Sequence, residues 1–313
     1  MKNKTTYSVS SVEQITHAYR SIVPKITPEL ADYWGLQRMR PWSLVTSDFH
    51  SVTFEQLKTL HERTLEIDRQ GFEEQEHGIA LRNAALSAGA GFSIGISPWT
   101  DNLLARTYTD DNDSVVILLG HDWYPIVTGD HPSGTPLMSW DSLHEVERYW
   151  PGAPEAVLNG SSVGLFVNLY PDYRPPGDPK CGNLSKYGYS YHQCLLGLDA
   201  LVAQIHKRFK HMQLISWGSD VWRALLPRVA NARQSVLLSA AIQEASGRVL
   251  EIELGGHKIP YLPVMHPGHW GNFGRPHHLR HVKAGYKALG LGLPGLGESK
   301  DGRVRAAREI ALI

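Results

Sequence analysis

The stretch that decides the fold is Ser114–Pro125, which reads SVVILLGHDWYP. Five apolar residues follow one another without polar alternation, a pattern typical of a strand that is buried on both faces of a sheet. Three similar runs come later in the chain: SVGLFVNLY at 162–170, MQLISWG at 212–218 and IPYLPVMHPG at 259–268. We therefore expect four buried strands.

Helical patterns lie between these runs. Ser190–Phe209 has a strong helical period before the third run, and Ser219–Val229 follows that run. Strand–helix alternation predicts a parallel sheet covered by helices. The fold class that we expect is α/β, a three-layer αβα arrangement around a central, mainly parallel four-stranded sheet. Residues 234–258 predict a strand and a hairpin inserted before the last strand.

The rest of the chain divides into three parts. Residues 1–100 are predicted to form a mostly helical N-terminal extension, because Thr53–Gly89 carries a long charged amphipathic pattern. Residues 101–285 are expected to form the α/β domain, with an insertion around 230–258. Residues 286–313 are expected to be a basic C-terminal tail.

Composition narrows the classes of function. Lys and Arg total 31 and so do Asp and Glu, so the formal net charge is zero and an overall basic footprint is absent. The two cysteines are too few for a Cys-only zinc site or an iron–sulfur cluster. Without an N-terminal apolar h-region or a long apolar run, we expect a cytoplasmic protein with no membrane partner. We also expect it to be a monomer and to need no cofactor.

Polar side chains come at or just after the ends of the four predicted strands. Asp122 follows the first run, Asn168 ends the second, Ser219 follows the third and His266 follows the fourth. Because the carboxyl ends of parallel strands meet at one edge of a sheet, we expect these residues to converge on one site.

In this order the motifs resemble the uracil-DNA glycosylase superfamily. That family carries G-Q-D-P-Y-H after its first strand, an Asn at the end of the second, W-G at the end of the third and H-P-S-P-L-S after the last. This chain has GHDWYP, VNLY, LISWG and HPGHWG at those places. The resemblance spans roughly residues 114–282 and implies a monofunctional DNA glycosylase that leaves an abasic site.

The resemblance also implies roles for single residues. Asp122 would stabilise the positive sugar and orient the attacking water, and His266 would stabilise charge on the departing base. The base itself would be bound by four side chains: His121, Tyr124, Trp140 and Asn168. The Asn168 amide offers a donor and an acceptor to a pyrimidine edge.

DNA is the partner that this resemblance implies. Trp270 stands where the family has the leucine that fills the gap left by a flipped base. Phosphate contacts are expected from the long loop and from the region after the last strand. The residues expected to bind DNA are Lys180, Lys186, His269, Trp270, Arg275 and His278.

Three departures from the family pattern bear on the substrate. His121 replaces the Gln, Trp123 the first Pro and Gly268 the Ser. The expected substrate is therefore a modified or damaged pyrimidine, with a bulky base in foreign or phage DNA as one candidate. His121 or His269 would supply the added protonation that a cytosine-type leaving group needs. Repair and antiviral defence would use the same chemistry.

Three alternatives stay open on the sequence alone. One is an ordinary uracil-DNA glycosylase of base-excision repair, and another is a non-catalytic DNA-binding protein on the same fold. The third is a metal-dependent hydrolase, because five histidines crowd together near the last strand. These are His266, His269, His277, His278 and His281.

Overall fold

The computed structural model describes residues 103–104, 107–121, 157–170, 191–230, 235–266 and 276–293, together with Ser21, which is helical. The rest of the expected N-terminal extension, residues 1–100, lies outside this part. The elements, in chain order, are β1 (Ser114–Gly120), β2 (Val163–Asn168), α8 (Tyr191–Arg208), β3 (His211–Trp217), α9 (Ser219–Leu225), the 3₁₀ helix η3 (Leu226–Arg228), α10 (Leu238–Ala245), β4 (Leu250–Leu254), β5 (His257–Val264) and α11 (Pro276–Ala288).

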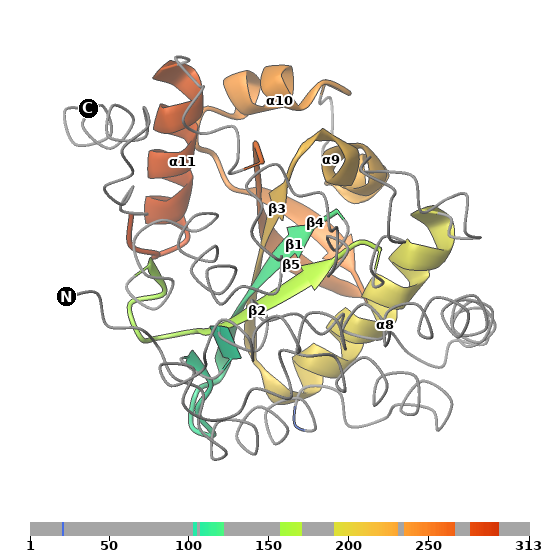
Figure 1. The fold of residues 1–313 in the computed structure, drawn as a ribbon, viewed down its shortest axis with the longest axis vertical. Coiled ribbons are helices and arrows are strands. Elements are labelled where there is room, and N and C mark those ends of the chain that lie inside the picture. Colours follow the sequence, from blue (N-terminus) through green and yellow to red (C-terminus); the bar gives the residue numbers. More distant parts are fainter. Residues whose placement is uncertain are drawn as a thin grey trace, which may run out of the picture.

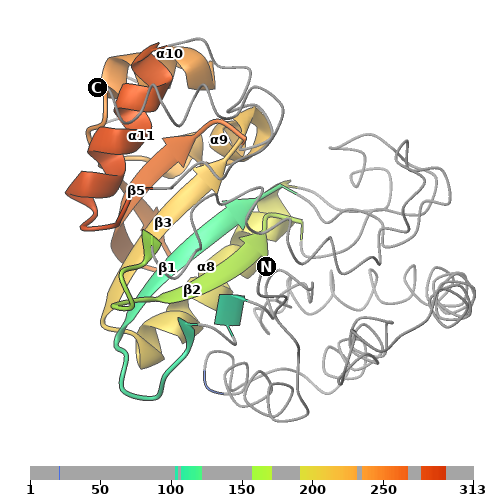
Figure 2. The same ribbon diagram turned by 60° about the vertical axis from the view of Figure 1, so that its left-hand side comes forward.

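The strands form one sheet in the order β2-β1-β3-β5-β4. Pairing is parallel between β2 and β1, β1 and β3, and β3 and β5 (Figure 2). Each of the four apolar runs in the sequence contains one of these parallel strands, so the prediction of a mainly parallel sheet is confirmed. The helices predicted over 190–209 and 219–229 correspond to α8 and to α9 with η3.

The region before the last strand differs from the expectation. Its first part is the helix α10 and not a strand, because Leu238, Ala241, Ile242 and Ala245 recur at helical spacing and are all buried. Its second part is β4, a fifth strand that pairs antiparallel with β5. Within the described residues the sheet therefore has five strands and not four.

The turn between β4 and β5 explains why the chain reverses there. Leu254 pairs with His257, which leaves only Gly255 and Gly256 in the loop. Both glycines have positive φ, at 58° and 79°, as a two-residue type I′ hairpin requires. The β4 side chains alternate between buried and exposed, with Glu251 and Glu253 outward on an edge strand.

Helices cover both faces of the sheet, which gives three layers (Figure 1). On one face α8, α9 and α10 pack against alternate residues of the strands, among them Ile117 and Leu119. On the other face α11 packs against the intervening residues, among them Leu118 and Trp217. We call these the α8 face and the α11 face. The near-continuous apolar runs follow from this double covering.

The packed domain continues past the boundary expected after Gly285. Helix α11 runs through that position to Ala288, and Tyr286, Leu289 and Leu291 are buried in the core of the α11 face. Residues 286–291 therefore pack with the domain, and the expected tail after residue 293 lies outside the described residues. None of the helices that the structure describes is long and apolar enough to cross a membrane.

Candidate functional site at the carboxyl edge of the sheet

Strand order determines where a ligand would bind. The chain passes from β1 to β2 on one side, while β3 lies on the other side of β1 and β5 lies beyond it. The order therefore reverses between β1 and β3. In open α/β sheets, ligands bind outside the carboxyl ends of the strands at such a point. The described residues at this edge include His121, Asn168, Trp217 and His266.

Register puts part of this edge in one row across the sheet. Asn168 pairs with Gly120, and Trp217 pairs with Val264. Leu119 pairs with Ser216, so the next residues, Gly120 and Trp217, are also neighbours. We call Asn168, Gly120, Trp217 and Val264 the edge row. Trp217 and Val264 belong to the core of the α11 face, so the side chains of this row lie on that face.

The Asn168 side chain lies over Gly120. A Cβ added at residue 120 would be only 2.1 Å from Oδ1 of Asn168, so the amide occupies the space that a side chain there would need. Asn168 is 7% exposed. The Asn168 amide is therefore held at the carboxyl edge of the sheet, next to the end of β1.

His266 stands two residues beyond Val264, and its side chain is exposed. The edge of the Trp217 indole faces its ring, with the two centroids 6.5 Å apart. Trp217 is itself buried against Phe166 at 5.2 Å between ring centroids. Trp217 thus separates Asn168 from His266 along the α11 face. With a strand spacing of about 4.8 Å, β2 and β5 are about 14 Å apart.

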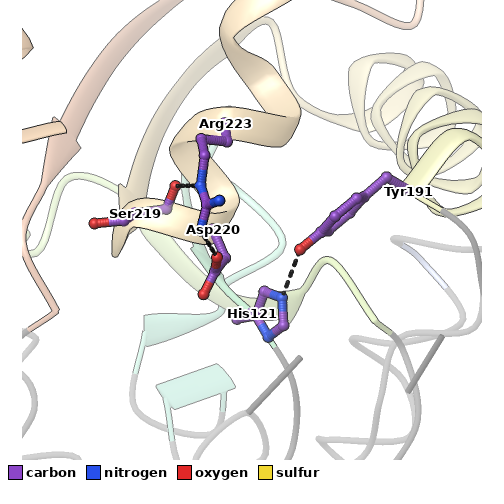
Figure 3. A network of polar contacts seen from close by, with 5 residues as sticks. All are labelled: His121, Tyr191, Ser219, Asp220 and Arg223. Carbon is purple, nitrogen blue, oxygen red and sulfur yellow. Dashed lines mark hydrogen bonds and ion pairs between the residues drawn. The ribbon is translucent and has the colours of Figure 1, made fainter. Parts of the chain in front are cut away.

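His121 lies on the opposite side of the sheet from this row. Its neighbour Leu119 belongs to the core of the α8 face, and its ring contacts Tyr170 at 5.1 Å between centroids. Its Nε2 is hydrogen-bonded to the hydroxyl of Tyr191 at 3.3 Å (Figure 3). The structure therefore brings Asn168 to the same face as Trp217, whose ring His266 contacts, and places His121 on the other face. The part played by Tyr191, which starts α8, had no signal in the sequence.

Helix α9 adds a charged pair to the same edge (Figure 3). Arg223 forms an ion pair with Asp220, and its Nε donates to the carbonyl oxygen of Ser219 at 3.4 Å. Both charged side chains are largely exposed, so their mutual attraction contributes little to stability. Arg223 is a cation at this edge that the sequence reading missed.

His278 and His281 of α11 are buried, at 1% and 0% exposed. The Met265 N–H donates to Nε2 of His278 at 3.3 Å. The Gly247 N–H donates to Nδ1 of His281, whose Nε2 is 2.9 Å from the carbonyl oxygen of Pro263. His278 was expected to bind DNA, but its buried ring is used inside the protein. Phosphate contact would require the ring to leave this position.

Burial also keeps both imidazoles neutral. Loss of hydration, with smaller contributions from the neighbouring His281 and His277, lowers the pKa of His278 to about 3. Loss of hydration lowers the pKa of His281 to about 4, against an opposing contribution from its hydrogen bond to Pro263. The charged form of a buried imidazole is disfavoured because it gives up its hydration.

The remaining predicted site residues lie outside the part of the chain that the structure describes. Among the residues that it does describe, no group of three or more His, Cys, Asp or Glu could hold a metal ion. The predicted residues outside the described part are Asp122, Tyr124, Trp140, Lys180, Lys186, His269, Trp270 and Arg275.

Comparison of the chain with protein-family models, with curated proteins and with solved structures gives no match.

Proposed function

We propose that this chain is a DNA glycosylase that turns a modified or damaged pyrimidine out of DNA and hydrolyses its N-glycosidic bond. The observation that carries the proposal is the place of the Asn168 amide, which lies over Gly120 at the carboxyl edge of the sheet, on the same face as Trp217, whose ring His266 contacts. The Watson–Crick edge of a pyrimidine offers the matching acceptor and donor.

The reaction replaces one bond at the sugar. Water forms a bond to C1′ while the C1′–N1 bond breaks. The electron pair of the broken bond leaves with the base, and the proton that the water loses ends on the departing base. The transition state has positive charge on the sugar and negative charge on the base. Asp122, which follows His121 in the chain, would stabilise the first charge and orient the water. His266 would stabilise the second through a hydrogen bond to the departing base.

Turning the base out of the duplex costs a few kcal/mol. A side chain that fills the gap, together with contacts to the phosphates, can offset about this cost. The wedge in this proposal is Trp270, with Lys180, Lys186 and Arg275 on the phosphates. Asn168 and His266 belong to strands about 14 Å apart. Trp217, which contacts His266, belongs to β3 between β2 and β5 and would border the base in this proposal.

The proposed substrate is a pyrimidine other than plain uracil. His121 and Trp123 depart from the family motif beside Asp122. His121 is engaged with Tyr170 and Tyr191 on the α8 face, so we do not assign it to the base edge that Asn168 reads. The contacts of His121 instead hold the backbone directly before Asp122.

The test is base release from a panel of oligonucleotides, single-stranded and duplex. Each carries uracil, thymine, cytosine or a 5-substituted pyrimidine at one position. Abasic sites are detected by alkaline cleavage, and the freed base is identified by mass. We expect release of a 5-substituted or damaged pyrimidine in preference to uracil, and loss of about 10²- to 10⁴-fold in rate for Asp122→Asn and His266→Ala.

Asn168 tests the reading of the base. Asn168→Asp keeps the shape but replaces the amide donor by an acceptor, so it should change which base is released, while Asn168→Ala should lower release of every base. His211→Gln at the opposite end of β3 is the control. Release of uracil alone would refute the substrate. No release from any substrate, with DNA still bound, would favour a non-catalytic DNA-binding protein.

A further inference from the structure

Two consecutive peptide groups before His266 are held by hydrogen bonds. The carbonyl oxygen of Pro263 is 2.9 Å from Nε2 of His281. The carbonyl oxygen of Val264 accepts from the Gly218 N–H at 3.0 Å. The Met265 N–H donates to Nε2 of His278 at 3.3 Å. The first group is held by α11 through His281, and the second is held on its carbonyl side by Gly218 and on its N–H side by His278 of α11.

The hydrogen bonds fix the form of both imidazoles. Backbone N–H groups are donors only, so Nε2 of His278 and Nδ1 of His281 must be acceptors. In the neutral rings the proton is then on Nδ1 of His278 and on Nε2 of His281. The latter donates to Pro263, which agrees with the observed contact. Each ring therefore has one orientation that satisfies the backbone around β5.

The two histidines differ in what they support. His281 connects Gly247, just after α10, to Pro263 inside β5, so it joins two packed elements. His278 instead contacts Met265, which is beyond the last residue of β5 and directly precedes His266. Of the two contacts, only that of His278 reaches past the end of β5, to the residue that directly precedes His266.

We propose that His278 is a positioning residue for His266: by accepting the Met265 N–H, it fixes the Val264–Met265 peptide group, one residue before the exposed imidazole of His266. This inference rests on the proposed function for the role of His266, but the hydrogen bond can be tested without it. The Trp217 indole limits the His266 ring from the side of β3, and His278 limits its backbone from the side of α11. A group that stabilises transition-state charge must be held in place, because a displacement of about 1 Å costs up to about 100-fold in rate.

The experiment compares two substitutions in the full chain. His278→Gln retains an acceptor near the position of Nε2, whereas His278→Leu fills similar space and accepts nothing. His278→Met is a second non-accepting variant if the Leu variant does not fold. His211→Gln, which removes an exposed histidine at the far end of β3, is the control. The measurements are thermal unfolding, kcat and KM for base release, and hydrogen exchange at the Met265 amide.

We expect the non-accepting variant to lower kcat by about 10- to 100-fold with KM nearly unchanged. The Gln variant should restore kcat to within about threefold of the original chain. Exchange at Met265 should be fast in the non-accepting variant and slow in the Gln variant. Unchanged kcat in the non-accepting variant, or equal losses in both variants, would overturn the proposal.

Failure of the proposed function has a different signature. If the unmodified chain releases no base, the kinetic comparison ends, and exchange at Met265 and the ring resonances of His266 decide the inference. Increased exchange and shifted His266 resonances in the non-accepting variant alone would support positioning by His278. The same exchange and resonances in all variants would refute it.

Discussion

Mild acid should destabilise this protein through the two buried histidines of α11. In the folded chain the pKa of His278 is about 3 and that of His281 is about 4, whereas the ordinary pKa of histidine is 6.5. As pH falls below about 6.5, the unfolded chain binds protons that the folded chain does not. The stability from the neutral rings is therefore fully present above about pH 6.5 and is lost progressively as pH falls toward the folded values.

The size of the loss at pH 5 follows from the unfolded state alone, because both folded pKa values lie below that pH. Each unfolded imidazole is almost fully protonated there. Integration of the linkage relation from about pH 7.5 to about pH 5 gives about 2 kcal/mol for each histidine, or about 4 kcal/mol for the pair. That sum is a large part of the roughly 5–15 kcal/mol by which proteins are stable.

Urea unfolding at the two pH values measures the effect, and His278→Gln isolates one half of it. Gln keeps an acceptor for Met265 but does not titrate, so the variant should lose about 2 kcal/mol less than the original chain over the same pH range. His211→Gln controls for the removal of an imidazole as such. An equal loss in the original chain and in His278→Gln would refute the reasoning, as would NMR titration of the His278 ring above pH 5 in the folded protein.

Three further substitutions test other parts of the structure. Gly120→Ala places a Cβ 2.1 Å from Oδ1 of Asn168, so base release should fall about 10- to 100-fold in a chain that still melts cooperatively. Gly255→Ala brings a Cβ within 2.6 Å of a backbone carbonyl of α8. In urea its free energy of unfolding should be about 1–3 kcal/mol lower than that of Gly256→Ala, where the added Cβ meets open space and only the positive φ is unfavourable. Tyr261→Phe removes a buried 2.7 Å hydrogen bond to a serine hydroxyl of β3, and the free energy of unfolding should fall by about 1–2 kcal/mol.

The sheet could be predicted because its strands are buried on both faces. In β1 and β2 almost every residue is apolar, and the number of consecutive apolar positions marks the strand without reference to any partner. The edge strand β4 gives a weaker signal, since its outward residues are Glu251 and Glu253. Helix α10 was mistaken for a strand because a short apolar run does not separate the two periods.

The candidate site could be predicted in part. The positions of the strand ends in the sequence were enough to predict Asn168 and His266 as site residues, because the carboxyl ends of parallel strands lie at one edge of a sheet. The face on which a side chain lies depends on register, which the sequence does not reveal. His121 follows Gly120 directly and yet contacts the α8 face, while Asn168 lies over Gly120 on the α11 face. The burial of His278 was also not predicted, because the segment HHLRH is rich in polar and basic residues and such segments are usually exposed.

The division of the edge between two faces has a consequence for specificity. Asn168 ends β2, and His266 follows β5. Helices pack on both faces of the sheet that contains these strands, so the sheet sets the spacing between the two residues, and that spacing resists change. His121 is held instead by Tyr170 and Tyr191, at the junction of β1 with the start of α8. A change at residue 121 would therefore alter the course of the chain into the adjoining Asp122 and leave the amide over Gly120 in place. In the proposed enzyme, the departure from the family motif at His121 would tune the reacting end of the substrate separately from the end that reads the base.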